Sequence, residues 1–115
     1  MLINDGCYNG KQILSKGTVR FLTSGKLLPW QQESLWRSWE SMAGYGYGNL
    51  MRVLEEPGMA LGNGWKDEYG WDGWLGTYFC NSPENGMTIL LFCQRKDSGT
   101  LELMRKIRNV IAAKL

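Results

Sequence analysis

The sequence YGWDGWLGTYFCNSPENGMTILLFCQ, residues 69–94, carries the strongest signals for strands and turns in this chain. In residues 69–80, large aromatic side chains alternate with three glycines, and one carboxylate, Asp72, lies among them. We interpret these residues as one strand, because aromatic residues are frequent in strands. Glycine inside a strand leaves no side chain to pack and costs backbone entropy, so each of these glycines needs a structural reason.

A turn and two further strands are predicted around this segment. CNSPENG, residues 80–86, has the proline and the Asn-Gly pair of a hairpin turn. Residues 87–94 are almost continuously apolar, as expected of a strand that is covered on both faces. YGYGNLMRVLEE, residues 45–56, alternates in a strand-like way and ends at a Pro-Gly pair.

Helices are predicted towards both ends of the chain. Residues 101–114 place apolar side chains at three-and-four spacing, which indicates an amphipathic helix. Its basic residues are expected mostly on the solvated side, and they are Arg105, Lys106, Arg108 and Lys114. Residues 13–25 favour a short helix with Ser15 as its N-cap. Residues 1–4 suit the end of a helix, and residues 27–44 suit a helical turn or an irregular lid.

The composition of the whole chain limits the classes of function. A chain of 115 residues with 43% apolar and 21% charged residues is typical of one globular domain, residues 1–115. The net charge is only +2, and no basic cluster interleaves with aromatic residues, which argues against nucleic-acid binding. No apolar run approaches the roughly 18–20 residues that span a bilayer. The first ten residues do not resemble a signal peptide, so we expect a cytoplasmic protein or a chain that lacks its true start.

The sequence offers little for metal or cofactor chemistry. It has no histidine, which is the commonest general base and the commonest metal ligand. Cys7, Cys80 and Cys93 are widely spaced, without a Cys-x-x-Cys pair, so we expect no metal and no cofactor. Buried free thiols fit this odd count best, although Cys80 and Cys93 flank the expected hairpin and a bridge between them is an alternative.

Four blocks of sequence, taken in order, carry a resemblance to a known family. They are MLINDGCYNGKQILSKGTVRFLTSG at 1–25, GYGYGNLMRVL at 44–54, the segment 69–94 and the final helix. Together they resemble the C-terminal part of the serine β-lactamase-like hydrolases. This family includes class C β-lactamases, penicillin-binding DD-peptidases and related serine esterases. The resemblance covers essentially the whole chain.

The resemblance implies that residues 69–80 form a wall of an active site. The family's third catalytic motif is Lys-Thr-Gly in many members, and Trp occupies its first position in some esterase-like ones. Trp71, Asp72 and Gly73 fall at this motif, and the amide that stabilises the oxyanion would come from the strand just after it, near Trp74. From the residues alone, an alternative is that the glycines mark bulges or packing contacts in an inert sheet.

The chain departs from the family in its reactive groups. The family's nucleophile lies in a Ser-x-x-Lys motif, which occurs nowhere in this sequence. TSGK at 23–26 and YGN at 47–49 imitate family motifs in spacing only. Trp71 cannot act as a cationic clamp for a carboxylate, and Asp72 replaces a neutral residue, so an esterase-like hydrolase is favoured over β-lactam recognition. The chain alone should not turn over a substrate, because acyl transfer needs a nucleophile and its base.

These observations predict an α+β fold. We expect a three-stranded antiparallel meander with the C-terminal helix packed on one face and a short N-terminal helix, as a fragment of the β-lactamase/transpeptidase-like fold. A sheet edge and an apolar face should be exposed, so we expect self-association or a partner chain that completes the sheet. A small ester or amide substrate would bind only to a full-length form. The alternatives are a standalone binding or assembly module and one chain of a split enzyme.

Overall fold

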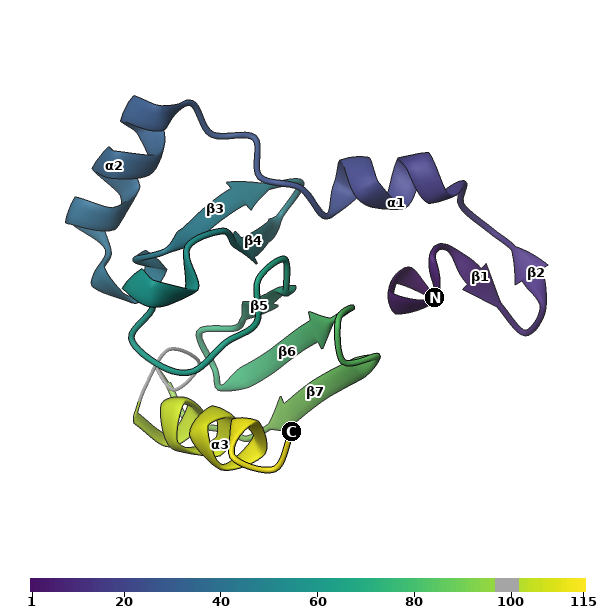
Figure 1. Ribbon diagram of the computed structural model, residues 1–115. Helices are drawn as coiled ribbons and strands as arrows, with labels where there is room; N and C mark the ends of the chain where they lie inside the picture. The colour runs from purple at the N-terminus through teal and green to yellow at the C-terminus, as the bar shows by residue number, and fades with distance from the viewer. Residues whose placement is uncertain (97–101) are drawn as a thin grey trace.

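The computed structural model describes residues 1–96 and 102–115, and it shows an α+β fold built on a five-stranded antiparallel sheet (Figure 1). The strands are β3 (Tyr45–Gly48), β4 (Met51–Leu54), β5 (Tyr69–Asp72), β6 (Thr77–Ser82) and β7 (Met87–Phe92). They lie side by side in the order of the sequence. The sheet is antiparallel as expected, but the prediction of three strands is wrong.

The first additional strand arises because residues 45–56 fold into a hairpin. Asn49 and Leu50 both have positive φ, 52° and 67°, so the chain reverses between β3 and β4. Two consecutive residues with positive φ are characteristic of a tight type I′ turn, which usually contains Asn-Gly. The turn is difficult to recognise from the sequence, because Leu50 occupies the position at which glycine usually follows asparagine.

The second additional strand arises in the same way within residues 69–80. The Gly73 amide donates to the Thr77 carbonyl at 2.7 Å, and Gly76, with φ of 97°, completes the turn between β5 and β6. Gly70 has a different reason to be glycine, because a Cβ atom there would lie 2.1 Å from the backbone oxygen of Phe79. The glycines therefore mark one close approach of two strands and one turn, and the prediction of a single strand is wrong.

The remaining hairpin agrees with its sequence signals. Between β6 and β7 the Gly86 amide donates to the Pro83 carbonyl at 3.2 Å, and Gly86 has positive φ, so the predicted turn is confirmed. β7 was expected to be covered on both faces, and this is wrong for the described residues. Leu90 is 59% exposed and Phe92 is 75% exposed.

Within the described residues, three helices and several short elements accompany the sheet. The helices are α1 (Lys16–Leu22), α2 (Pro29–Ser38) and α3 (Glu102–Ala112), and the 3₁₀ turns are η1 (Leu2–Asn4), η2 (Glu40–Met42) and η3 (Pro57–Met59). A separate two-stranded sheet pairs β1 (Cys7–Tyr8) with β2 (Lys11–Gln12). The predicted N-cap of α1 is confirmed, because Ser15 Oγ accepts from the Thr18 amide at 3.0 Å. Of the predicted C-terminal helix, residue 101 lies outside the described residues.

The segment 27–44, for which the sequence suits either a helical turn or an irregular lid, contains a regular helix, α2. Pro29 occupies the first turn of α2, where its missing N–H costs nothing. The Gln31 side chain accepts from the Leu28 amide at 2.9 Å and caps the same end. The Trp36 indole donates to the Tyr45 carbonyl at 2.7 Å, which fixes α2 against β3.

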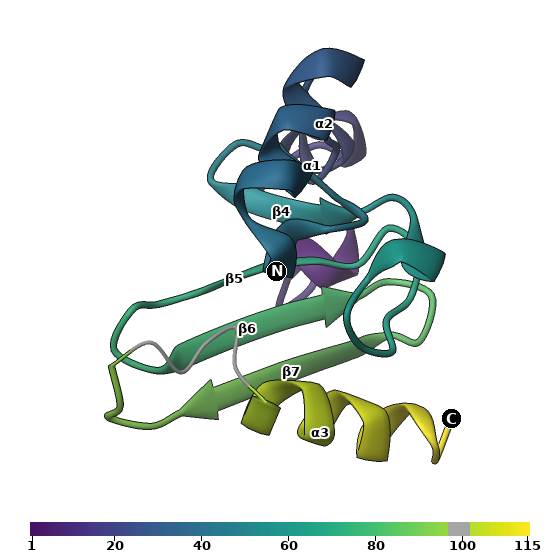
Figure 2. The same ribbon diagram turned by 90° about the vertical axis from the view of Figure 1, so that its left-hand side faces the viewer.

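Two apolar clusters hold the helices to opposite ends of the sheet. Figure 2 shows α2 above the sheet and α3 running beside β7. Met104 of α3 packs on the cluster of Tyr78, Cys80 and Ile89, whose side chains share one face of the sheet. At the other end, Met42, Tyr45 and Leu54 form the second cluster, with Leu35 of α2 packed against it. No helix in the described ranges is long and apolar enough to cross a membrane.

Arg108 of α3 lies inside the protein, so its expected position on the solvated side is wrong. Its Nη2 donates to Glu68 Oε1 at 2.6 Å, its Nη1 to the Tyr78 hydroxyl at 2.7 Å and its Nε to the Asn63 carbonyl at 2.9 Å. Glu68 is only 1% exposed. The helix is therefore bound to the sheet by an ion pair as well as by apolar contacts.

Substituting Leu50 with glycine should stabilise the protein, which would confirm the turn between β3 and β4. A non-glycine residue in left-handed conformation costs about 1–2 kcal/mol, whereas an added glycine costs about 0.5–1 kcal/mol of entropy. We expect Leu50→Gly to raise the free energy of unfolding by about 0.5–1 kcal/mol in urea titrations. Leu75→Gly is the control, since Leu75 is also an exposed turn residue but lacks positive φ, and it should destabilise. Equal losses in both variants would contradict the turn.

Candidate functional site

The candidate motif lies at the end of β5 and in the turn that follows it. Trp71 and Asp72 are the last two residues of β5, while Gly73 and Trp74 belong to the turn. The prediction that Trp74 lies on a strand is wrong. It lies at the tip of the hairpin between β5 and β6, where its side chain is 68% exposed. Its ring lies 5.1 Å from Lys96 Nζ, a cation–π contact.

A shallow depression of about 420 Å³ opens beside this motif. It is lined by Trp71, Asp72, Gly73, Thr77, Tyr78, Phe79, Leu90 and Phe92. Phe79 lies opposite both Trp71 on β5 and Leu90 on β7, so three neighbouring strands contribute apolar side chains to one face. The depression can therefore accept an apolar group.

The orientation of Trp71 is set by two aromatic neighbours. Its ring meets the rings of Tyr47 and Trp39 edge to face, with centroids 5.3 Å and 6.0 Å apart. Such contacts stabilise by about 0.5–1.5 kcal/mol beyond the area that they bury. Tyr47 comes from β3 and Trp39 from the residue between α2 and η2, so segments far apart in sequence meet at this residue. No sequence pattern indicates that Trp39 belongs near the motif.

Asp72 is bound to Arg52 of β4 in a buried ion pair. Arg52 Nη1 donates to Asp72 Oδ1 at 2.5 Å, and the two side chains are 8% and 11% exposed. The guanidinium carbon also lies 5.1 Å and 5.5 Å from the ring centroids of Tyr45 and Tyr78. Burial alone would lower the pKa of Arg52, but the Asp72 carboxylate together with Tyr45 and Tyr78 outweighs burial, and the pKa is raised. The charge of Asp72 is thus balanced within the sheet.

Arg52 was not recognised as a functional residue from the sequence. The available signal was a charge within the apolar run MRVL, at a position where alternation predicts a side chain facing the core. A buried charge of this kind requires a partner. The sequence could not identify that partner, which is 20 residues away.

The two segments that imitate family motifs do not assemble at the depression. The Thr23 hydroxyl donates to the Val19 carbonyl of α1 at 2.9 Å and so caps that helix. Lys26 Nζ donates instead to Ser24 Oγ at 2.6 Å, near the protein surface. Asn49 donates to the Phe21 carbonyl at 3.0 Å, and Tyr47 packs on Trp71. These residues have structural roles here.

The cysteines and acidic residues provide no metal centre in the described parts of the chain. No group of three or more Cys, Asp or Glu residues in residues 1–96 and 102–115 is arranged to hold a metal ion. Within residues 1–96 and 102–115, Cys7, Cys80 and Cys93 form no disulfide, so the alternative of a bridge between Cys80 and Cys93 is wrong. Burial raises the pKa of Cys80 to about 11, which disfavours the reactive thiolate.

Comparison with known proteins adds no family assignment. The sequence matches no protein-family model and no curated protein. The geometry of the site is therefore interpreted from its residues. It combines an apolar depression, the Asp72 carboxylate with its charge balanced by Arg52, and the turn after β5, whose backbone amides include that of Trp74.

Removing the Asp72 charge should strongly destabilise the protein. Asp72→Asn leaves the Arg52 guanidinium buried without a counter-charge, and loss of one partner of a buried pair costs about 3–5 kcal/mol. The free energy of unfolding, measured by urea titration at neutral pH, should fall by about that amount. Glu33→Gln is the matched control, because Glu33 and Arg37 also lie 2.5 Å apart but on the surface. A small effect in both variants would contradict the structural role of Asp72.

Proposed function

We propose that this chain is the C-terminal part of a β-lactamase-like serine hydrolase, which cleaves an ester or amide through an acyl-serine intermediate in its full-length form. The observation that carries the proposal is the hairpin of β5 and β6, which holds Trp71, Asp72 and Gly73 at the rim of the apolar depression. The four sequence blocks of the resemblance support it independently. The chain alone is inactive, because it has no Ser-x-x-Lys motif.

The proposed roles of the motif residues follow from their environments. Trp71 forms an apolar wall, since aromatic contacts with Tyr47 and Trp39 fix its ring. Asp72 acts structurally, because its carboxylate is held by Arg52. By the resemblance, the Trp74 amide stabilises the oxyanion of the tetrahedral intermediate.

The apolar lining of the depression favours an apolar ester as the substrate of the proposed hydrolase. The lining of the depression includes no lysine or arginine that could bind a substrate carboxylate, and its only acidic residue, Asp72, is paired. β-Lactam and peptidoglycan substrates carry a carboxylate, and none of the described residues that line the depression is a cation that could receive it. An ester with a hydrophobic acyl or alcohol group matches the lining of Trp71, Phe79, Leu90 and Phe92.

We also propose that β7 is the edge at which further chain completes the sheet. Within the described residues, β7 pairs with β6 only, and its sequence MTILLF has no charge or proline to discourage pairing. Leu90 and Phe92 are exposed on the face of the depression. In a full-length hydrolase this edge would receive the remaining strands. In the isolated chain it would pair with a second copy of itself.

The hydrolase proposal is tested by reading the DNA upstream of Met1 and expressing the longer reading frame. We expect an in-frame Ser-x-x-Lys motif and hydrolysis of nitrophenyl acetate by the longer protein. Trp74→Pro, which removes one amide, should lower its kcat by about 100-fold or more. Trp74→Ala, which keeps the amide, is the control and should have a much smaller effect. Absence of the motif upstream, or serine-dependent turnover by the isolated chain, would overturn the proposal.

The pairing of β7 is tested by analytical ultracentrifugation of the isolated chain. We expect a concentration-dependent dimer, and Leu90→Lys should shift the population towards the monomer by placing a charge on the exposed apolar face. Val110→Lys is the control, because Val110 is comparably exposed but lies on α3. A compact monomer at every concentration would contradict self-association of this chain.

A further inference from the structure

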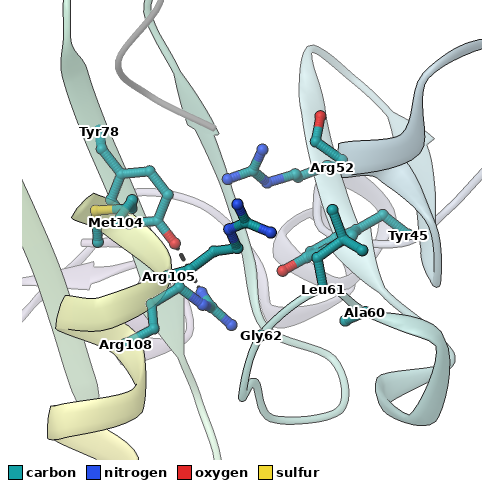
Figure 3. Close-up of a pocket in the computed structure, with 10 residues that line it drawn as sticks. Tyr45, Arg52, Ala60, Leu61, Gly62, Tyr78, Met104, Arg105 and Arg108 are labelled. Atoms are coloured by element: carbon teal, nitrogen blue, oxygen red, sulfur yellow. Dashed lines mark hydrogen bonds between the residues drawn. The ribbon is translucent and has the colours of Figure 1, made fainter. Parts of the chain in front are cut away.

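A second pocket lies across the sheet from the depression, between the sheet, α3 and the loop after η3 (Figure 3). Tyr78 points into this pocket and also reaches the depression, whereas Phe79, the next residue of β6, lines only the depression. Consecutive strand residues face opposite sides, so Phe79 and its cross-strand partner Leu90, which line only the depression, lie on the face opposite to Tyr78. This pocket therefore does not rest on the proposed hydrolase function.

The lining of this pocket is rich in positive charge. Arg52 from β4 and Arg105 and Arg108 from α3 all line it, and none of the described acidic residues does (Figure 3). Arg52 and Arg108 each have one buried carboxylate partner behind the lining, Asp72 and Glu68. Arg105 lies across Gly62 and forms no ion pair with any described residue. Among the residues that the structure describes, three guanidinium groups against two carboxylates leave one positive charge without compensation.

Three hydroxyl groups lie in the described lining, and that of Tyr45 donates to Glu68 at 3.0 Å, while those of Ser41 and Tyr78 add hydrogen-bonding capacity. Ser41 Oγ is buried and makes no hydrogen bond to any residue that the structure describes. Buried polar groups in proteins are nearly always satisfied, so this hydroxyl calls for a partner inside the pocket. Burial raises the pKa of Tyr78 to about 12, so its hydroxyl stays protonated while its oxygen accepts from Arg108.

The size of the pocket restricts what can satisfy these groups. Its volume is about 40 Å³. One water needs roughly 10–15 Å³ by this measure, so about three water-sized groups fit. A carboxylate group has three heavy atoms and is planar, and arginine binds it with two parallel hydrogen bonds. A tetrahedral phosphate with five heavy atoms fits less well.

We propose that this pocket binds the carboxylate group of a small organic acid. Arg105 covers the mouth and supplies the uncompensated charge, Arg52 contributes a second guanidinium from the sheet, and Ser41 donates from its buried hydroxyl. Arg108 is a positioning residue, because its donors are already engaged by Glu68, Tyr78 and Asn63. Binding would join α3 to the loop after η3.

Acetate is the simplest probe of this site, with chloride and phosphate at equal ionic strength as comparisons. Calorimetric titration should detect one acetate site per chain, and acetate should raise the thermal midpoint of unfolding more than chloride does. Equal effects of acetate and chloride would overturn the proposal, because water alone would then fill the pocket. Tighter binding of phosphate than of acetate would overturn the carboxylate assignment.

Two substitutions locate the bound acetate. Arg105→Gln should weaken acetate binding by about tenfold or more, since a charge-assisted hydrogen bond is lost, and Ser41→Ala should weaken it by about threefold or more. Arg20→Gln makes the same change of charge on the exposed surface of α1 and should leave acetate affinity within about twofold. Equal losses in Arg105→Gln and Arg20→Gln would show non-specific attraction and overturn the site. Arg105 is exposed, so its variant should fold, which circular dichroism checks.

Discussion

The buried ion pair between Glu68 and Arg108 is the contact on which the arrangement of the structure depends. Glu68 Oε1 accepts from Arg108 at 2.6 Å and from the Tyr45 hydroxyl at 3.0 Å, while Oε2 accepts from the Trp65 amide at 3.1 Å. Removing two charges from water is costly and is tolerated only when hydrogen bonds satisfy both groups. Here the partners come from β3, from the loop before β5 and from α3, so one contact joins three parts of the chain.

This ion pair also explains why the two faces of the sheet differ. On the face that carries Tyr78, Cys80 and Ile89, α3 covers the apolar side chains and Arg108 brings charge into the interior. The positive lining of the pocket, made by Arg52, Arg105 and Arg108, follows from this burial of Arg108. Buried arginines that lie close together favour a negatively charged neighbour. Among the described residues that line the depression, Asp72 alone is charged, and its pairing with Arg52 leaves the depression apolar.

Local features of this fold could be predicted from the sequence, and long-range ones could not. The turn before β7, the N-cap at Ser15 and the body of α3 depend on neighbouring residues, so their signals are visible. The turn at Asn49 and Leu50 was missed because leucine rarely adopts positive φ, and only the surrounding sheet makes it do so. The pairing of Glu68 with Arg108 spans 40 residues, and helical periodicity alone placed Arg108 on the wrong side.

In the candidate site, too, local features could be predicted from the sequence and long-range contacts could not. Trp71, Asp72 and Gly73 could be singled out because aromatic residues, a carboxylate and glycine are unusual together, but their partners could not. Arg52 and Trp39 determine what the motif residues can do, and both are brought to them by tertiary packing. A carboxylate fixed by a buried guanidinium is poorly suited to moving protons in a reaction. In the proposed hydrolase this strand would therefore contribute shape and backbone donors, and the acid–base chemistry would belong to residues outside this chain.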